Sequence, residues 1–201
     1  MAITTYAELQ TAIANWLVRG DLTSRIPEFI ALAEAQLQRD VRHWRMENRA
    51  TATIDARFSA LPDDFLAPVR MQISTARYPL DLITSDEMHE KRAYAADGTG
   101  EPRFYTIIGG EFEFFPTPSG SHTATLTYRQ KIPALSDANT SNWLLSFAPD
   151  VYLWGSLMQS APLLQEDERL ATWAGLYSSA LAGLTMSEND RWSAPMKMKS
   201  R

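Results

Sequence analysis

The chain has 201 residues and a mass of 22.6 kDa; 45% of its residues are hydrophobic and 21% are charged. This composition excludes disorder over the bulk of the chain, and the lack of cysteine excludes disulfides and thiolate metal sites. The net charge is −5, but residues 191–201 carry four cations and no acid, so the remaining chain carries −9. An acidic body with a short basic tail argues against a DNA-binding protein.

Neither a secretion signal nor a membrane span is predicted. The first residues lack the basic region and apolar core of a signal peptide. The apolar runs are far shorter than the roughly 18 to 20 residues of a membrane span. We therefore expect a soluble cytosolic protein.

The first two predicted elements are amphipathic helices. Thr5 and Glu8 have capping-box spacing at the first helix start, and Arg19-Gly20 suits its end. The second helix is predicted to begin near Pro27. The apolar stripes are Tyr6, Leu9, Ile13, Trp16 and Leu17 in the first helix, and Ile26, Phe29, Ile30, Ala33, Leu37, Val41 and Trp44 in the second. A connection of a few residues predicts an antiparallel helical hairpin.

The middle of the chain has the period of two that is typical of strands. Gly109-Gly110 predicts a tight hairpin turn, because both residues can adopt positive φ angles. In the strand after this turn, Glu111 and Glu113 are expected to face solvent, while Phe112 and Phe114 face the core. The predicted strands are 49–54, 65–73, 78–83, 104–108, 111–115 and 123–130, with a short helix from Thr84 or Ser85 to Tyr94.

Helical periodicity returns after a polar connection at 136–142. One helix is predicted to begin near Pro149 and another at the acidic run 165–168, which suits a helix N-terminus. Residues 190–201 show no periodicity and are interrupted by Pro195. The predicted buried faces are Val151, Trp154, Leu157, Met158 and Ala161, and then Leu170, Trp173, Leu176, Tyr177, Leu181 and Leu184.

The order of elements predicts an α+β fold. Two N-terminal and two C-terminal helices can bury their stripes in a four-helix bundle, with an inserted antiparallel β lobe of five or six strands. The predicted divisions are a helical hairpin at 1–46, the β lobe at 47–135, the C-terminal helices at 136–189 and a basic tail at 190–201.

The polar residues do not predict a chemical centre. His43, His89 and His122 lie in unlike surroundings and are each expected to be surface or partly buried structural residues. The acidic pairs Asp63-Asp64 and Asp86-Glu87, like the run 166–168, lie at turns or helix starts, where carboxylates are favoured for structural reasons. We predict no catalytic residue, no cofactor and no metal site.

The six tryptophans could form a carbohydrate platform, but core packing explains four of them better. Those four, on helical stripes, are Trp16, Trp44, Trp154 and Trp173. Trp143 and Trp192 lie in irregular segments and are freer to meet a partner. Trp192 precedes Met196, Met198 and several cations, which together would make an adaptable contact segment.

Several stretches together resemble a family of adaptor proteins found below the portal of tailed bacteriophages. The resemblance covers nearly all of residues 1–189 in element order. The strongest stretch is the opening, at 6–10, 15–17, 21–22 and 26–35. The other similar stretches are 39–42, 46–47, 49–50, 61–66, 148–155, 161–162, 167–169 and 173–174.

This resemblance implies a structural virion protein without enzymatic activity, with relatives among the tail tubular proteins of short-tailed phages. It implies a homo-oligomeric ring of twelve subunits at the neck, between the portal and a downstream tail or nozzle protein. DNA would pass through the lumen without sequence-specific binding during ejection, and assembly would take place in the host cytoplasm. The tail would become a portal-binding arm of Arg191, Trp192, Met196, Lys197, Met198, Lys199 and Arg201.

Two other classes of function stay open at this point. The β lobe could be a carbohydrate- or protein-binding module, for which Tyr94, Tyr105 or Phe115 would form a flat exposed platform. A hydrolase acting through Asp63 or Asp64 is the third reading.

Overall fold

The computed structural model describes residues 2–76, 78–95, 98–164 and 168–190. These residues form two compact units, a helical unit of residues 2–46 and 132–190 and a β unit of residues 47–131. The prediction of a mixed α+β protein is confirmed. The β unit ends at Lys131 rather than at 135.

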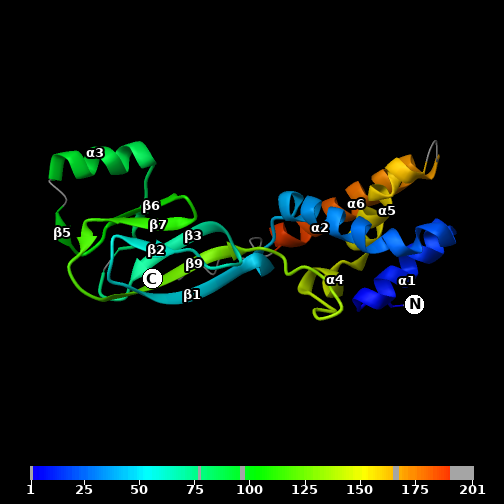
Figure 1. The fold of residues 1–201 in the computed structure, drawn as a ribbon, viewed down its shortest axis with the longest axis horizontal. Coiled ribbons are helices and arrows are strands. Elements are labelled where there is room, and N and C mark those ends of the chain that lie inside the picture. Colours follow the sequence, from blue (N-terminus) through cyan, green and yellow to red (C-terminus); the bar gives the residue numbers. More distant parts are fainter. Residues whose placement is uncertain (1, 77, 96–97, 165–167, 191–201) are drawn as a thin grey trace, which may run out of the picture. The chain divides into compact units, whose positions relative to one another are not determined.

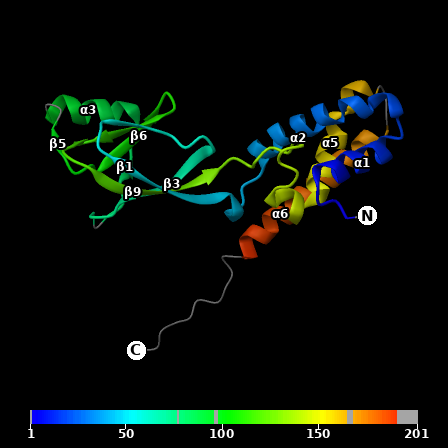
Figure 2. The ribbon, with the colours of Figure 1, turned by 60° about the horizontal axis from the view of Figure 1, so that its bottom comes forward.

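The helical unit is organised around one central helix. Helix α5 (Pro149–Gln159) packs against α1 (Tyr6–Leu17), α2 (Ile26–Asp40) and α6 (Arg169–Asp190), as Figure 2 shows. Four shorter helices complete the unit: α4 (Trp143–Phe147) and three 3-10 helices at Gly20–Arg25, Trp44–Met46 and Ala161–Leu163.

The start of α1 is as predicted, but its end is not. The Glu8 amide donates to Thr5 Oγ1 at 3.3 Å and the Thr5 amide donates to Glu8 Oε2 at 3.0 Å, which confirms the capping box. The helix ends at Leu17, and Val18 adopts the left-handed conformation with φ of 54°, whereas Gly20 begins the next short helix. Trp16 is 50% exposed, because it lies beside the buried stripe and not on it.

Side chains of α2 hold the chain where it returns to the helical unit. Gln38 donates to the Ile132 carbonyl at 2.6 Å and accepts from the Ile132 amide at 3.1 Å. One turn away, Glu34 Oε1 accepts from the Leu135 amide at 2.8 Å. These bonds explain why residues 132–135 belong with the helices.

The β unit packs two sheets around a shared core (Figure 1). One sheet has the order β1-β9-β3, the second β2-β7-β6-β4, and β5 pairs with β8. The core between the first two contains Met71, Ile73, Phe112, Phe114 and Leu126. The strands are β1 (Glu47–Ile54), β2 (Phe58–Ala60), β3 (Phe65–Ile73), β4 (Asp81–Leu82), β5 (Thr99–Gly100), β6 (Phe104–Ile108), β7 (Glu111–Phe115), β8 (Thr117–Pro118) and β9 (His122–Gln130).

The long strands were predicted, and of the short ones only β4 was, as part of a longer strand. Gly109 and Gly110 have φ of 62° and 86° in the turn between β6 and β7, as the sequence predicts. The described residues contain nine strands rather than five or six, because β2, β5 and β8 have only two or three residues and no period to detect. The strand expected at 78–83 is reduced to β4. The sheets are also not wholly antiparallel, since β4–β6 and β5–β8 are parallel pairs.

The C-terminal helices differ from the prediction in three respects. Asn142 caps an unpredicted helix, α4, by accepting from the Leu145 amide at 2.8 Å. Because three helices surround α5, it buries Tyr152, Leu153, Gly155 and Ser156 as well as Val151 and Leu157, while Trp154 and Met158 are only partly buried. In α6, Leu176 is exposed, although Trp173, Tyr177 and Leu184 are buried.

Candidate functional site

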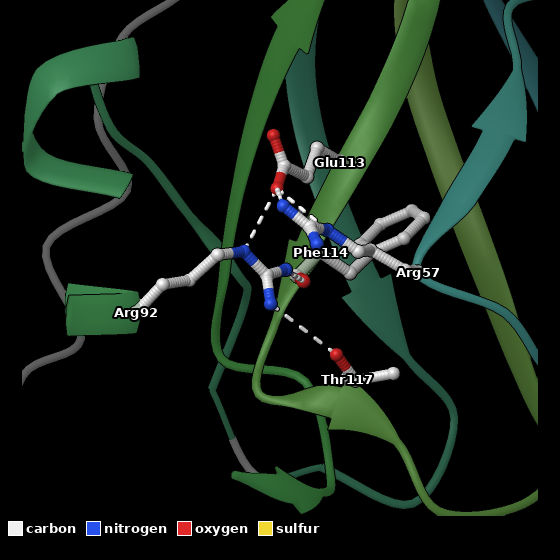
Figure 3. Close-up of polar contacts among 5 residues, drawn as sticks. All are labelled: Arg57, Arg92, Glu113, Phe114 and Thr117. Atoms are coloured by element: carbon white, nitrogen blue, oxygen red, sulfur yellow. Dashed lines mark hydrogen bonds and ion pairs between the residues drawn. The ribbon is translucent and has the colours of Figure 1, made fainter. Parts of the chain in front are cut away.

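The most concentrated group of buried charges in the described chain surrounds Glu113 on β7. Its Oε1 atom accepts from Arg57 Nε at 2.9 Å, from Arg57 Nη2 at 2.7 Å and from Arg92 Nε at 2.8 Å (Figure 3). Glu113 is 6% exposed and Arg92 is 8% exposed. We call these three residues the Glu113 cluster.

The place of Glu113 in the sheet explains its burial. Phe112 and Phe114 lie in the core between the two sheets. Glu113 points to the opposite face of β7, which is covered by helix α3 (Ser85–Ala95). The expectation that Glu113 faces solvent was therefore wrong, because β7 is an inner strand with both faces covered.

Arg92 ties α3 to this strand. Its Nη2 donates to the Phe114 carbonyl at 2.6 Å and its Nη1 to Thr117 Oγ1 at 3.4 Å (Figure 3). The guanidinium also lies over the Phe115 ring, 5.4 Å from its centroid. A planar group with five donors suits this role, since one arginine can bind a carboxylate, a carbonyl and a hydroxyl together.

Arg57 ties the segment before β2 to the same strand. Besides the bonds to Glu113, its carbonyl accepts from the Phe114 amide at 2.9 Å. Its guanidinium lies 4.9 Å from the Phe58 ring centroid. The Glu113 cluster thus joins three separate parts of the β unit. Neither arginine was singled out from the sequence, because their partner lies 21 to 56 residues away.

The cluster has the chemistry of a structural joint. Its carboxylate accepts hydrogen bonds from two guanidinium groups, and these bonds tie three segments of the β unit together. Within the part of the chain that the structure describes, no group of three or more histidine, aspartate or glutamate side chains could hold a metal ion.

His43 is more deeply buried than the sequence predicts, at 3% exposure. Its Nδ1 accepts from the Arg45 amide at 3.2 Å, and Ser187 Oγ lies 3.4 Å from Nε2. The rings of Trp143 and Trp44 stack on it at centroid distances of 5.3 and 5.7 Å. Its position fits a structural role within the helical unit. By contrast, His89 is exposed, and His122 is partly buried with no hydrogen-bond partner for Nε2 among the described residues.

The acidic pairs that the structure describes take part in hydrogen bonds that stabilise the fold. Asp64 Oδ1 accepts from the Tyr128 hydroxyl at 2.8 Å, and the Asp63 carbonyl accepts from Lys131. Burial, followed by this bond to Asp64, raises the pKa of Tyr128. Glu87 caps α3 by accepting from the Thr84 amide at 2.9 Å, and bonds with Thr84 lower the pKa of Glu87. Residues 166 and 167 lie outside the described residues.

The tryptophans divide differently from the prediction. Trp173 is buried, but Trp16 and Trp44 are exposed, at 50% and 38%. Trp16 packs edge-to-face on Trp154 with centroids 5.1 Å apart. Trp143 was expected in an irregular segment, free to meet a partner, yet it begins α4 and stacks on His43.

The aromatic platform proposed for a carbohydrate module does not form. Tyr105 and Phe115 are buried, and only Tyr94 is exposed. The predicted portal-binding residues lie outside the described residues; they are Arg191, Trp192, Met196, Lys197, Met198, Lys199 and Arg201.

In the described residues, the buried polar side chains around Glu113 join segments of the β unit that are distant in sequence. Over residues 4–199 the chain matches the family described as SU10 adaptor protein, and it belongs to that family. A search of curated proteins gave no match.

Membership makes the chain a structural bacteriophage adaptor protein. It implies a non-enzymatic role, a place at the neck of the virion, and contacts with portal and tail proteins. Of the helices described, none has the length and apolar character needed to cross a membrane.

Proposed function

We propose that this protein is the subunit of a dodecameric ring that connects the portal to the tail and lets DNA pass through its lumen. The observation that carries the proposal is the family match over residues 4–199, which includes both units. In this proposal the chain is related to the tail tubular proteins of short-tailed phages, assembles in the host cytoplasm and lines the path of DNA ejection.

The helical unit supports a role as the rigid body of such a subunit. Helices α1, α2, α5 and α6 act as a four-helix bundle in this proposal, with the β unit as an insertion. Gln38 and Glu34 of α2 form hydrogen bonds with Ile132 and Leu135, where the chain re-enters the helical unit after the β unit. The β unit can therefore be inserted without opening the helical core.

The negative net charge supports a channel that does not bind DNA over its whole surface. The net charge is −5, and twelve copies would multiply it. An acidic lumen repels phosphate and lets a duplex slide. In the same proposal the basic tail, residues 190–201, docks on the portal.

Negative-stain electron microscopy of the protein mixed with its phage's portal tests the ring, with each component alone as the control. We expect a second ring stacked coaxially on the portal, with twelvefold symmetry in class averages. Bare portals at micromolar protein would contradict the proposal and favour a β unit that acts as a binding module for another protein.

A further inference from the structure

One face of the sheet β1-β9-β3 is mostly polar, although Ala67 pairs with Arg129 near one end of it. The other face contributes Met71, Ile73, Ala124 and Leu126 to the core. Because side chains alternate along a strand, the remaining positions share the outer face. We call the polar residues of this surface the hydroxyl–arginine face; in the strands they are Glu47, Arg49, Thr51, Thr53, Arg70, Gln72, Thr123, Thr125, Thr127 and Arg129. Ser74, which follows β3 and donates its amide to the Thr123 carbonyl at 2.8 Å, completes the face.

The strand register arranges these residues in rows. Arg49 and Arg70 both pair with Thr127, one on each side of β9. Thr51 and Gln72 flank Thr125 in the next row. Neighbouring strands lie about 4.8 Å apart, so the backbones of Arg49 and Arg70 are about 10 Å apart, with Thr127 between them.

The centre of this face is hollowed. The hollow has a volume of about 320 Å³, and the polar side-chain groups of its lining are guanidinium, amide and hydroxyl groups. Arg70 Nη2 donates to Gln72 Oε1 at 2.7 Å, and no ion pair of the described residues uses Arg49 or Arg70. The lining residues are Arg49, Arg70, Gln72, Ser74, Thr125 and Thr127.

The charge of the face is opposite to that of the chain. It has three arginines and one glutamate, whereas the whole chain has a net charge of −5. Guanidinium and hydroxyl donors bind phosphate oxygens, and such contacts carry no sequence information. The rows from Glu47 to Thr53 extend about 20 Å along the strand, which suits an extended polyanion better than a single small ion.

We propose that the hydroxyl–arginine face contacts the phosphate backbone of double-stranded DNA. The proposal rests on the proposed passage of DNA and names the surface that meets it. Two or three phosphate contacts per subunit give weak, salt-dependent attraction without base recognition. Such contacts centre a moving duplex without stopping it, because the rest of the chain is acidic.

The test is binding of a fluorescein-labelled 20-base-pair duplex to the full chain by fluorescence anisotropy, between about 50 and 200 mM salt. We expect the double variant R49Q/R70Q to lose at least about tenfold in affinity at the low-salt end. The slope of log affinity against log salt should become shallower by about 2, since two phosphate contacts are removed. Both residues are exposed, so the melting temperature should not change.

Two variants control for net charge and for side-chain identity. R19Q/R25Q removes the same charge from exposed ion pairs of the helical unit and should bind DNA as the wild type does. R49K/R70K keeps the charge of the face and should stay within a few-fold of wild-type affinity.

Four outcomes would overturn the proposal. The first is absence of DNA binding at low salt, and the second is equal loss in R49Q/R70Q and R19Q/R25Q. The third is competition by millimolar inorganic phosphate at constant ionic strength, which would indicate a small-anion site. The fourth is loss of ring stacking on portals by R49Q/R70Q with unchanged DNA binding, which would indicate a protein interface. If R49Q/R70Q stacks normally on portals but has a reduced affinity for DNA, the proposal is supported. Stacking of the wild-type protein on portals tests the ring itself, separately from DNA binding.

Discussion

At the scale of single residues, the described chain places its buried charges where they join segments distant in sequence. Glu113 accepts hydrogen bonds from arginines of two different segments. A charge taken out of water is costly unless it is paired, so each partner depends on the others. Glu34 is different: it accepts from the Leu135 amide and the Tyr152 hydroxyl, and its described bonds include no cation.

We predict that Glu113→Ala lowers the free energy of unfolding by about 3 to 5 kcal/mol, because Arg92 would be left buried without its carboxylate. The loss is measured by urea unfolding. Glu111→Ala is the matched control, since this residue is exposed on the same strand and should cost less than about 0.5 kcal/mol. Equal effects of the two substitutions would show that the cluster does not support the β unit.

The environment of Glu34 predicts a pH dependence of stability. Burial raises the pKa of Glu34 above its ordinary value. The folded state therefore binds more protons than the unfolded state between the two pKa values, and the free energy of unfolding falls as pH rises through that window. Glu34→Gln keeps an oxygen acceptor for the Leu135 amide. Because glutamine does not titrate, the variant does not undergo this fall in the free energy of unfolding. Its melting temperature relative to wild type should rise between pH 4 and pH 7, whereas a constant difference would contradict the prediction.

At the scale of elements, Gly155 in α5 allows α2 and α6 to approach this helix closely. A Cβ atom there would lie 3.2 Å from Tyr177 Cε2 and 3.6 Å from the Ala33 Cβ. The Tyr177 ring is held by its hydroxyl, which donates to Asp40 Oδ2 at 3.1 Å. Burial and this bond also raise the pKa of Tyr177. A glycine at this position thus lets α5 contact both α2 and α6.

We predict that Gly155→Val destabilises the protein by about 1 to 3 kcal/mol through overpacking. Gly175→Ala is the control, because a Cβ at that position in α6 meets nothing within 4 Å. The control should stabilise by about 0.5 to 1 kcal/mol, since alanine favours a helix over glycine. Thermal unfolding compares them, and a valine tolerated at 155 would mean that the helices are less tightly packed.

At the scale of the whole molecule, charge is divided between an acidic body and a basic end. Residues 191–201 carry four cations in a chain of net charge −5. Within the β unit, the hydroxyl–arginine face is a second, local concentration of cations. The proposed ring would use these regions differently, with the tail on the portal and the face on DNA.

We predict that deletion of residues 191–201 leaves the melting temperature unchanged, because α6 ends at Asp190, and weakens portal binding in pull-down. Replacing Arg191, Lys197, Lys199 and Arg201 with glutamine separates charge from the contacts of Trp192, Met196 and Met198. Normal pull-down by the deletion variant would eliminate the docking arm.

The sequence by itself determined the features that depend on neighbouring residues. The Thr5 and Glu8 cap and the Gly109-Gly110 hairpin need only short-range geometry, and both formed as predicted. The longer helices and strands were recognisable because their apolar residues repeat with a detectable period, even over the five residues of β6 and of β7. The family resemblance was also visible in the sequence, and the match over residues 4–199 confirmed it as that of a phage adaptor.

Only the tertiary structure decided which polar residues are buried and which aromatic residues are exposed. Glu113 and Trp16 each follow a local pattern that predicts the opposite environment. Their burial depends on which segments cover them: α3 covers Glu113, whereas the neighbouring helices leave half of Trp16 in solvent. The rows of the hydroxyl–arginine face likewise depend on the pairing of β9 with β1 and β3, whose residues are far apart along the chain. Pairings of this kind leave no local signal, because they are fixed by packing between distant segments.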